Sequence, residues 1–209
     1  MSRILFFFLF ISFQLLAAET AVLEQGKSDF FTLKKTQVGN HLEVAVADLD
    51  GKILSLEKIE IENDQFKTYV WKQFQTGEQV KLKLAGNKLE FESDKKDKTI
   101  ELSKDELAKM VLPPLLTHSL QSRIKKHPLK KEFEVMVIVP DKMMTLDFNF
   151  KKINENSDQS EWILEPDSFF VGLIVGQVTI YFDKNLKLLK IKDITLPIRP
   201  TQKTDILFK

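Results

Sequence analysis

The sequence predicts a mainly β fold, a curved antiparallel meander or half-barrel covered by a broken helical hairpin. Three observations predict it. Apolar and polar residues alternate with period two in many segments, turn-forming residues recur about every ten or twelve positions, and one central stretch has helical periodicity instead. Period-two alternation gives a sheet one dry and one wet face, which is typical of antiparallel sheets.

The N-terminus, MSRILFFFLFISFQLLAAET, is predicted to be a secretory signal peptide of residues 1–18. Arg3 supplies a positive start, and Ile4 to Leu16 form an apolar core of thirteen residues, whereas a spanning helix needs about 20. Leu16 stands three residues before the expected cleavage point, where a small residue is usual, so an uncleaved membrane anchor is the alternative. We expect residues 19–209 to form a single domain.

Charge and cysteine content narrow the class of protein. The chain has 31 basic and 30 acidic side chains, and loss of Arg3 with the signal peptide leaves the two signs equal. A general nucleic-acid binder would need a basic excess, so no nucleic-acid partner is expected. The chain has no cysteine and no N-x-S/T glycosylation site. An exported chain lacking both fits a Gram-negative periplasm better than a eukaryotic secretory route.

The strands are predicted from turns and alternation. In VAVADLDGKILSL, Asp50-Gly51 between apolar runs is a strong hairpin signal. Two later segments have one apolar face each, made of Val80, Leu82 and Leu84 in the first and of Met144, Leu146, Phe148 and Phe150 in the second. The apolar phase shifts between Leu56 and Ile59 in KILSLEKIEIE and between Leu188 and Leu189 in LKLLKIKDITL, so we expect a β-bulge at each shift, and bulges bend a sheet.

The helical insertion is predicted at about residues 103–127, within SKDELAKMVLPPLLTHSLQSRIKKHP. Ser103 and Glu106 have capping-box spacing. Pro113-Pro114 interrupts the apolar stripe, and Pro114 is expected to begin a second helix, which Pro128 ends.

The segment SFFVGLIVGQVTIYF, residues 168–182, raises the question of a membrane span. Its fifteen uncharged residues are too few for an ordinary spanning helix, and aspartates flank it. We expect Phe169 to Val175 to be a short helix or strand, and Gln177 to Phe182 to be a central strand buried on both faces. An outer-membrane barrel is disfavoured because segments such as EQVKLKL are short and rich in lysine.

No residue pattern indicates catalysis or a cofactor. His41, His118 and His127 are far apart in sequence, and neither a zinc motif nor a nucleophile motif is present. The sequence therefore predicts a non-enzymatic protein without metal or cofactor; an enzyme with no recognisable motif is the alternative.

The layout resembles two groups of exported proteins. FEVMVIVPDKMMTLDFNF and VTIYFDKNLKLLKIKDI are similar to the later strands of exported Gram-negative proteins of unknown function. The meander with a helical insertion also resembles the half-barrel of the lipoprotein-localisation carriers. Because those carriers bind acyl chains, the resemblance implies an apolar ligand; it covers most of the mature chain by layout alone and transfers no functional residue.

The leading hypothesis is a periplasmic protein that holds a lipid, acyl chain or lipoprotein client between the sheet and its helical lid. The predicted apolar pocket consists of Met110, Leu115, Leu116, Leu120, Met144, Leu146, Phe148 and Phe150. A second predicted contact, with anionic surfaces such as lipid headgroups, consists of Arg123, Lys125, Lys126, Lys130 and Lys131; the alternative is a solvated helix end.

The alternative function is an envelope protein–protein interaction module. In this hypothesis the helices completely fill the concave side of the curved sheet. A free sheet edge or an exposed loop then binds another envelope protein. A continuous apolar cavity under the helices favours the first hypothesis, and a long unpaired edge favours the second.

Overall fold

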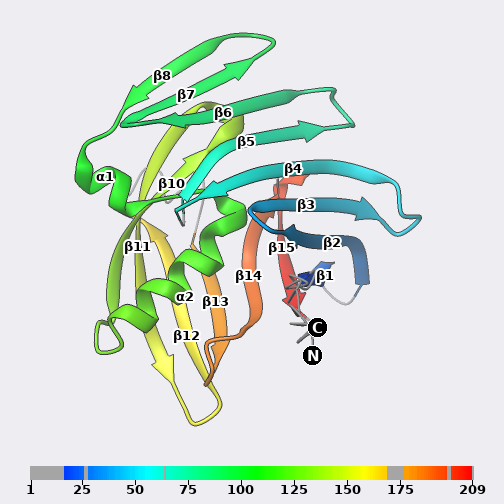
Figure 1. The fold of residues 1–209 in the computed structure, drawn as a ribbon. Coiled ribbons are helices and arrows are strands. Elements are labelled where there is room, and N and C mark those ends of the chain that lie inside the picture. The colour runs from blue at the N-terminus through cyan, green and yellow to red at the C-terminus, as the bar shows by residue number, and fades with distance from the viewer. Residues whose placement is uncertain (1–16, 26–27, 64, 169–176, 197–198, 209) are drawn as a thin grey trace, which may run out of the picture.

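The computed structural model describes residues 17–25, 28–63, 65–168, 177–196 and 199–208, and the fold is mainly β, as predicted. In these residues one sheet has the strand order β8-β7-β6-β5-β4-β3-β2-β1-β15-β14-β13-β12-β11-β10-β9 (Figure 1). The strands of the first half are β1 (Ala17–Gln25), β2 (Ser28–Val38), β3 (His41–Asp48), β4 (Ile53–Glu62), β5 (Gln65–Gln73), β6 (Gln79–Ala85), β7 (Lys88–Ser93) and β8 (Asp97–Glu101). Those of the second half are β9 (Met110–Val111), β10 (Glu132–Val139), β11 (Met144–Glu155), β12 (Gln159–Pro166), β13 (Val178–Asp183), β14 (Leu188–Leu196) and β15 (Arg199–Phe208).

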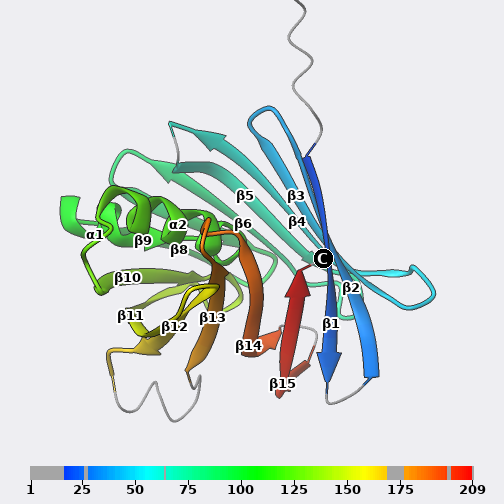
Figure 2. The same cartoon turned by 90° about the horizontal axis from the view of Figure 1, so that it is seen from below.

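The sheet consists of two antiparallel meanders, β1–β8 and β10–β15, which are joined where the first and last strands pair. It curls, so that its two end strands, β8 and β9, lie on the same side of the molecule, opposite β1 and β15 (Figure 2). The sheet is therefore barrel-like without being closed, because β8 and β9 are not paired with each other in the described part of the chain.

Residues 135–138 of strand β10 are buried on both faces and separate two apolar clusters, whereas Glu132 and Glu134 of the same strand are exposed. Phe133 and Val135 face the first cluster, which includes the inner residues of β11–β14 and helix α2. Met136 and Ile138 face the second cluster, which includes the inner residues of β3–β7. The curl of the sheet thus brings the end of the second meander against the inner face of the first, and this contact explains the nearly continuous apolar run EFEVMVIV.

The helical insertion consists of α1 (Lys104–Lys109), a 3₁₀ turn η1 (Pro113–Leu115) and α2 (Leu116–Lys126). The capping box is present, with Ser103 accepting from the Glu106 amide and Glu106 accepting from the Ser103 amide. Pro114 does not begin the second helix. It lies in the 3₁₀ turn, because the paired prolines stabilise a tight turn before the α-helix begins at Leu116. Leu120 and Ile124 of α2 are buried against the first cluster.

Replacing Ser103 by alanine is expected to destabilise α1 locally by about 1 kcal/mol, because α1 has no buried residue to compensate for a lost cap. The measurement is amide hydrogen exchange at Glu106 and Leu107, which should become faster. Lys104→Ala, an exposed change in the same helix, is the matched control. Equal exchange in both variants would contradict a stabilising role for the cap.

The two expected bulges have different outcomes. In β14 the pairing with β13 shifts between Leu188 and Lys190, which leaves Leu189 as the extra residue, as predicted. In β4 the prediction is wrong: pairing is regular from Ser55 to Glu60, and the bulge lies at Leu54. The side chains of Ser55, Glu57 and Ile59 in β4 therefore all point to the same face of the sheet, the inner one.

The segment 168–182 is described only in part. Its second half is the central strand β13, with Ile180 and Phe182 fully buried and Tyr181 half-buried, so burial on both faces is confirmed only in part. The first half, Phe169 to Val175, lies outside the described residues. No helix in the described ranges is long and apolar enough to cross a membrane. Most of the predicted signal peptide also lies outside these ranges; Ala17 and Ala18 begin β1.

Candidate binding site on the inner face of β4 and β5

The residues of the predicted apolar pocket lie in several places. Leu120, Phe148 and Phe150 belong to the first cluster and are at most 5% exposed, and Leu116 and Leu146 pack against that cluster. Leu115 contacts both clusters, Met110 packs against the second, and Met144 is 37% exposed. The structure thus brings six of the eight to the first cluster, which also contains Trp162.

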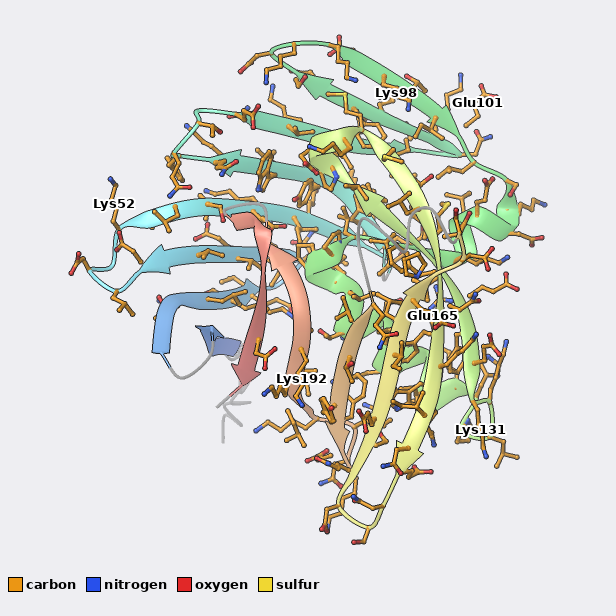
Figure 3. All side chains as sticks on the ribbon, turned by 180° about the vertical axis from the view of Figure 1, so that it is seen from behind. Lys52, Lys98, Glu101, Lys131, Glu165 and Lys192 are labelled. Carbon is orange, nitrogen blue, oxygen red and sulfur yellow. The ribbon has the colours of Figure 1, made fainter. Side chains whose placement is uncertain are left out.

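The residues predicted to contact an anionic surface are also divided. Lys125, Lys126, Lys130 and Lys131 are exposed, and Figure 3 shows Lys131 projecting from the lower part of the molecule. Arg123 differs, because its guanidinium donates to the Ala108 carbonyl oxygen at 2.8 Å and to the Glu134 carbonyl oxygen at 3.4 Å. It therefore holds α1 and β10 together.

An open groove of about 450 Å³ lies beside this arginine. Its lining carries both charge signs, with Lys109 bonded to Glu134. The full lining consists of Lys109, Arg123, Lys130, Glu132, Phe133, Glu134 and Asn149. Because Lys109 is paired with Glu134, Arg123 donates to backbone carbonyl oxygens and both charge signs line the groove, it has little preference for a ligand of either charge.

A different site follows from the register of β4 and β5. Val44 of β3, Glu57 of β4 and Trp71 of β5 are direct cross-strand partners, so their side chains share one face. One step along the strands, Ser55 pairs with Gln73. The inner face of a barrel-like sheet is expected to be apolar, yet β4 and β5 place three adjacent polar side chains, Ser55, Glu57 and Gln73, on it.

Glu57 is the charged member of this group. Its carboxylate accepts a hydrogen bond of 2.9 Å from the Tyr69 hydroxyl. Burial raises the pKa of the Glu57 carboxyl from 4.5 to about 7, although the hydrogen bond from Tyr69 acts in the opposite direction. Burial and the Glu57 charge together raise the pKa of Tyr69 well above its usual range, so Tyr69 stays neutral and remains a donor.

Parts of this polar group have no hydrogen-bond partner. Ser55 and Gln73 are only 5% and 6% exposed, and neither Ser55 Oγ nor Gln73 Nε2 has a hydrogen-bond partner among the described residues. No side-chain nitrogen or oxygen in that part of the chain is both fully buried and unpaired. Both atoms therefore keep some solvent-accessible surface. Glu57 is half-buried between its apolar cross-strand neighbours Val44 and Trp71.

The site combines polar and apolar groups that can contact a ligand. It offers a carboxyl that titrates near neutral pH, a hydroxyl and an amide, next to an apolar wall of Leu42, Val44, Ile59, Trp71, Val80 and Leu82. In the described residues no group of three or more acidic or histidine side chains is placed to hold a metal ion. A ligand with both a polar and an apolar part matches this arrangement.

Sequence reasoning missed this site because it placed the β4 bulge between Leu56 and Ile59. With that bulge, Leu56 would face inward and Glu57 outward. A strand without a bulge between Leu56 and Ile59 would place Glu57 on the same face as Ile59. The observed pairing has this regular register, with Ile59 opposite Leu42 and Glu57 opposite Val44.

Comparison with known proteins supports the fold alone. The chain is similar to a solved β-barrel-like protein of a domain of unknown function, DUF1849, from Brucella abortus. The TM-score is 0.50, the sequence identity is 12%, and the match covers 93% of this chain and 94% of that one. No family model matches the chain, and no curated protein matches it. The likeness confirms a barrel-like β fold over nearly the whole chain.

Proposed function

We propose that the protein is a non-enzymatic, exported protein of the periplasm that binds an amphiphilic ligand, a lipid or the acylated segment of a lipoprotein client, on the inner face of β4 and β5. The observation that carries the proposal is the accessible polar group Ser55, Glu57 and Gln73 within an otherwise apolar wall. Apolar wall and polar group together suit a molecule that has an alkyl part and a headgroup. The proposed position differs from the predicted pocket under α2, where the side chains pack against one another.

The test is native mass spectrometry of residues 19–209 purified from the periplasm of a lipid-containing host, followed by extraction under denaturing conditions. We expect a released adduct of lipid mass. Ser55→Trp, which places an indole beside Glu57 and Gln73, should remove the adduct while leaving the circular dichroism spectrum unchanged. Glu43→Gln, on the outer face of neighbouring β3, is the matched control and should keep it.

Two results would oppose this function. One is a bare chain mass that persists after incubation with phospholipid and acylated peptide. The other is an adduct that Ser55→Trp and Glu43→Gln retain equally, which would place the ligand elsewhere.

A second candidate function is protein–protein interaction at strand β8, because β8 is the end strand of the sheet and pairs only with β7 in the described part. Its residues are mostly exposed, and Figure 3 shows Lys98 and Glu101 along it. Charged side chains on an edge usually prevent pairing with other chains, which weakens this candidate. A bare protein in the experiment above would favour it.

A further inference from the structure

The charge at the candidate site points to the headgroup of the ligand. Carboxylates on the outer face of β3 and β4 have lysine partners, with Glu43 3.5 Å from Lys58 and Glu60 3.7 Å from Lys67. Glu57, on the inner face, has Tyr69 as its hydrogen-bond donor and no cationic partner among the described residues. Its environment therefore lacks the positive charge that usually accompanies a carboxylate in an apolar surrounding.

The other ionisable groups near Glu57 do not supply that charge. Asp141 of the 3₁₀ turn η2 (Pro140–Lys142) acts on Tyr69 as a second negative charge and is itself paired with Lys142 at 2.9 Å. The cross-strand neighbours of Glu57, Val44 and Trp71, are uncharged. The local charge is thus negative whenever Glu57 is ionised.

We propose that the ligand carries an ammonium group, which pairs with the Glu57 carboxylate while its alkyl part lies on the surrounding apolar wall. This inference rests on the proposed function and names the class of its ligand. An ammonium group donates up to three hydrogen bonds. Glu57 accepts one, and Ser55 Oγ, the next polar atom along the inner face of β4, has no partner among the described residues and can accept another; Gln73 Oε1 already accepts from Thr76 at 3.4 Å.

The anionic and neutral alternatives fit less well. An anionic headgroup would meet the Glu57 charge without a described cation to offset it, and like charges at short range repel. A neutral hydroxyl would bond to the same acceptors without relieving the uncompensated charge of the carboxylate. An ammonium group does both, and it gains more than it would in water because the site is poor in solvent.

The experiment compares three probes with the same six-carbon chain: hexylammonium, hexanol and hexanoate. Binding to residues 19–209 is followed from the indole N–H resonance of Trp71 in heteronuclear NMR, assigned with Trp71→Phe. At about pH 8.5, where Glu57 is ionised, hexylammonium should bind about tenfold or more tightly than hexanol, and hexanoate more weakly than both. At about pH 5.5 the preference for hexylammonium should shrink, because Glu57 is then protonated while the alkylamine stays charged.

Glu57→Gln should abolish the preference at both pH values, and the control Glu43→Gln should keep it. The outcomes separate the two proposals. If all three probes bind equally, or hexanoate binds best, the ammonium inference fails while ligand binding on the inner face stands. If no probe shifts the Trp71 resonance and mass spectrometry finds no adduct, both fail. A preference for hexylammonium that Glu57→Gln retains would also overturn the role of Glu57.

Discussion

Replacing Phe150 by alanine is expected to lower the free energy of unfolding by about 3–5 kcal/mol. Phe150 is fully buried, and its ring stacks on Trp162 with centroids 4.6 Å apart and planes 10° from parallel. Phe133 contacts both rings, with centroids 6.4 Å from Phe150 and 6.2 Å from Trp162. Three rings from three adjacent strands thus share one packed volume, so truncating the central ring leaves a cavity that rigid neighbours cannot fill.

The measurement is urea unfolding followed by circular dichroism. Ile153→Ala is the matched control, because Ile153 lies on the same strand, β11, but is 51% exposed; its effect should stay within about 0.5 kcal/mol. If Phe150→Ala cost no more than Ile153→Ala, the three-ring cluster would not be a principal source of stability in the second meander.

Much of the fold could be predicted from local sequence rules. Alternation in β11 put Phe148 and Phe150 on the dry face, and the capping box at Ser103 marked the start of α1, because both depend on neighbouring residues alone. The pairing of β1 with β15 and the burial of residues 135–138 of β10 on both faces could not be predicted. They depend on how the whole sheet curls, which joins residues far apart in sequence.

The candidate site was beyond local rules for a related reason. Predicted pocket residues such as Leu120 and Phe150 are apolar and correctly assigned to the interior, but apolar side chains facing each other pack together rather than leave a space. The candidate site is instead formed by Ser55, Glu57 and Gln73, polar side chains on the inner face of β4 and β5. Finding it requires the exact register of β4, and a displaced bulge assigns Glu57 to the wrong face.

The second large expected effect concerns the pH dependence of stability, which Glu57→Gln should change. The pKa of the Glu57 carboxyl is about 7 in the folded protein and 4.5 as its ordinary value, which we take for the unfolded chain. Between these values the folded state holds a proton that the unfolded state has released. The free energy of unfolding contributed by Glu57 therefore falls as pH rises from about 4.5 to about 7, and it is constant above.

Each pKa unit corresponds to about 1.4 kcal/mol, so this loss amounts to at most about 3 kcal/mol. Glutamine has nearly the same shape as protonated glutamate and still accepts the Tyr69 hydrogen bond, but it does not ionise. We expect the variant to match the natural protein near pH 4.5 and to exceed it in stability above about pH 7 by up to about 3 kcal/mol.

Urea unfolding at a series of pH values measures this difference, and the other carboxyl groups contribute equally to both proteins and cancel. Glu43→Gln, which removes an exposed carboxylate with a lysine partner, should give a curve parallel to that of the natural protein. Parallel curves for Glu57→Gln as well would mean that Glu57 ionises in the folded protein as it does in water. In that case the inner face at β4 would be well hydrated, and the preference for an ammonium ligand would lose its physical basis.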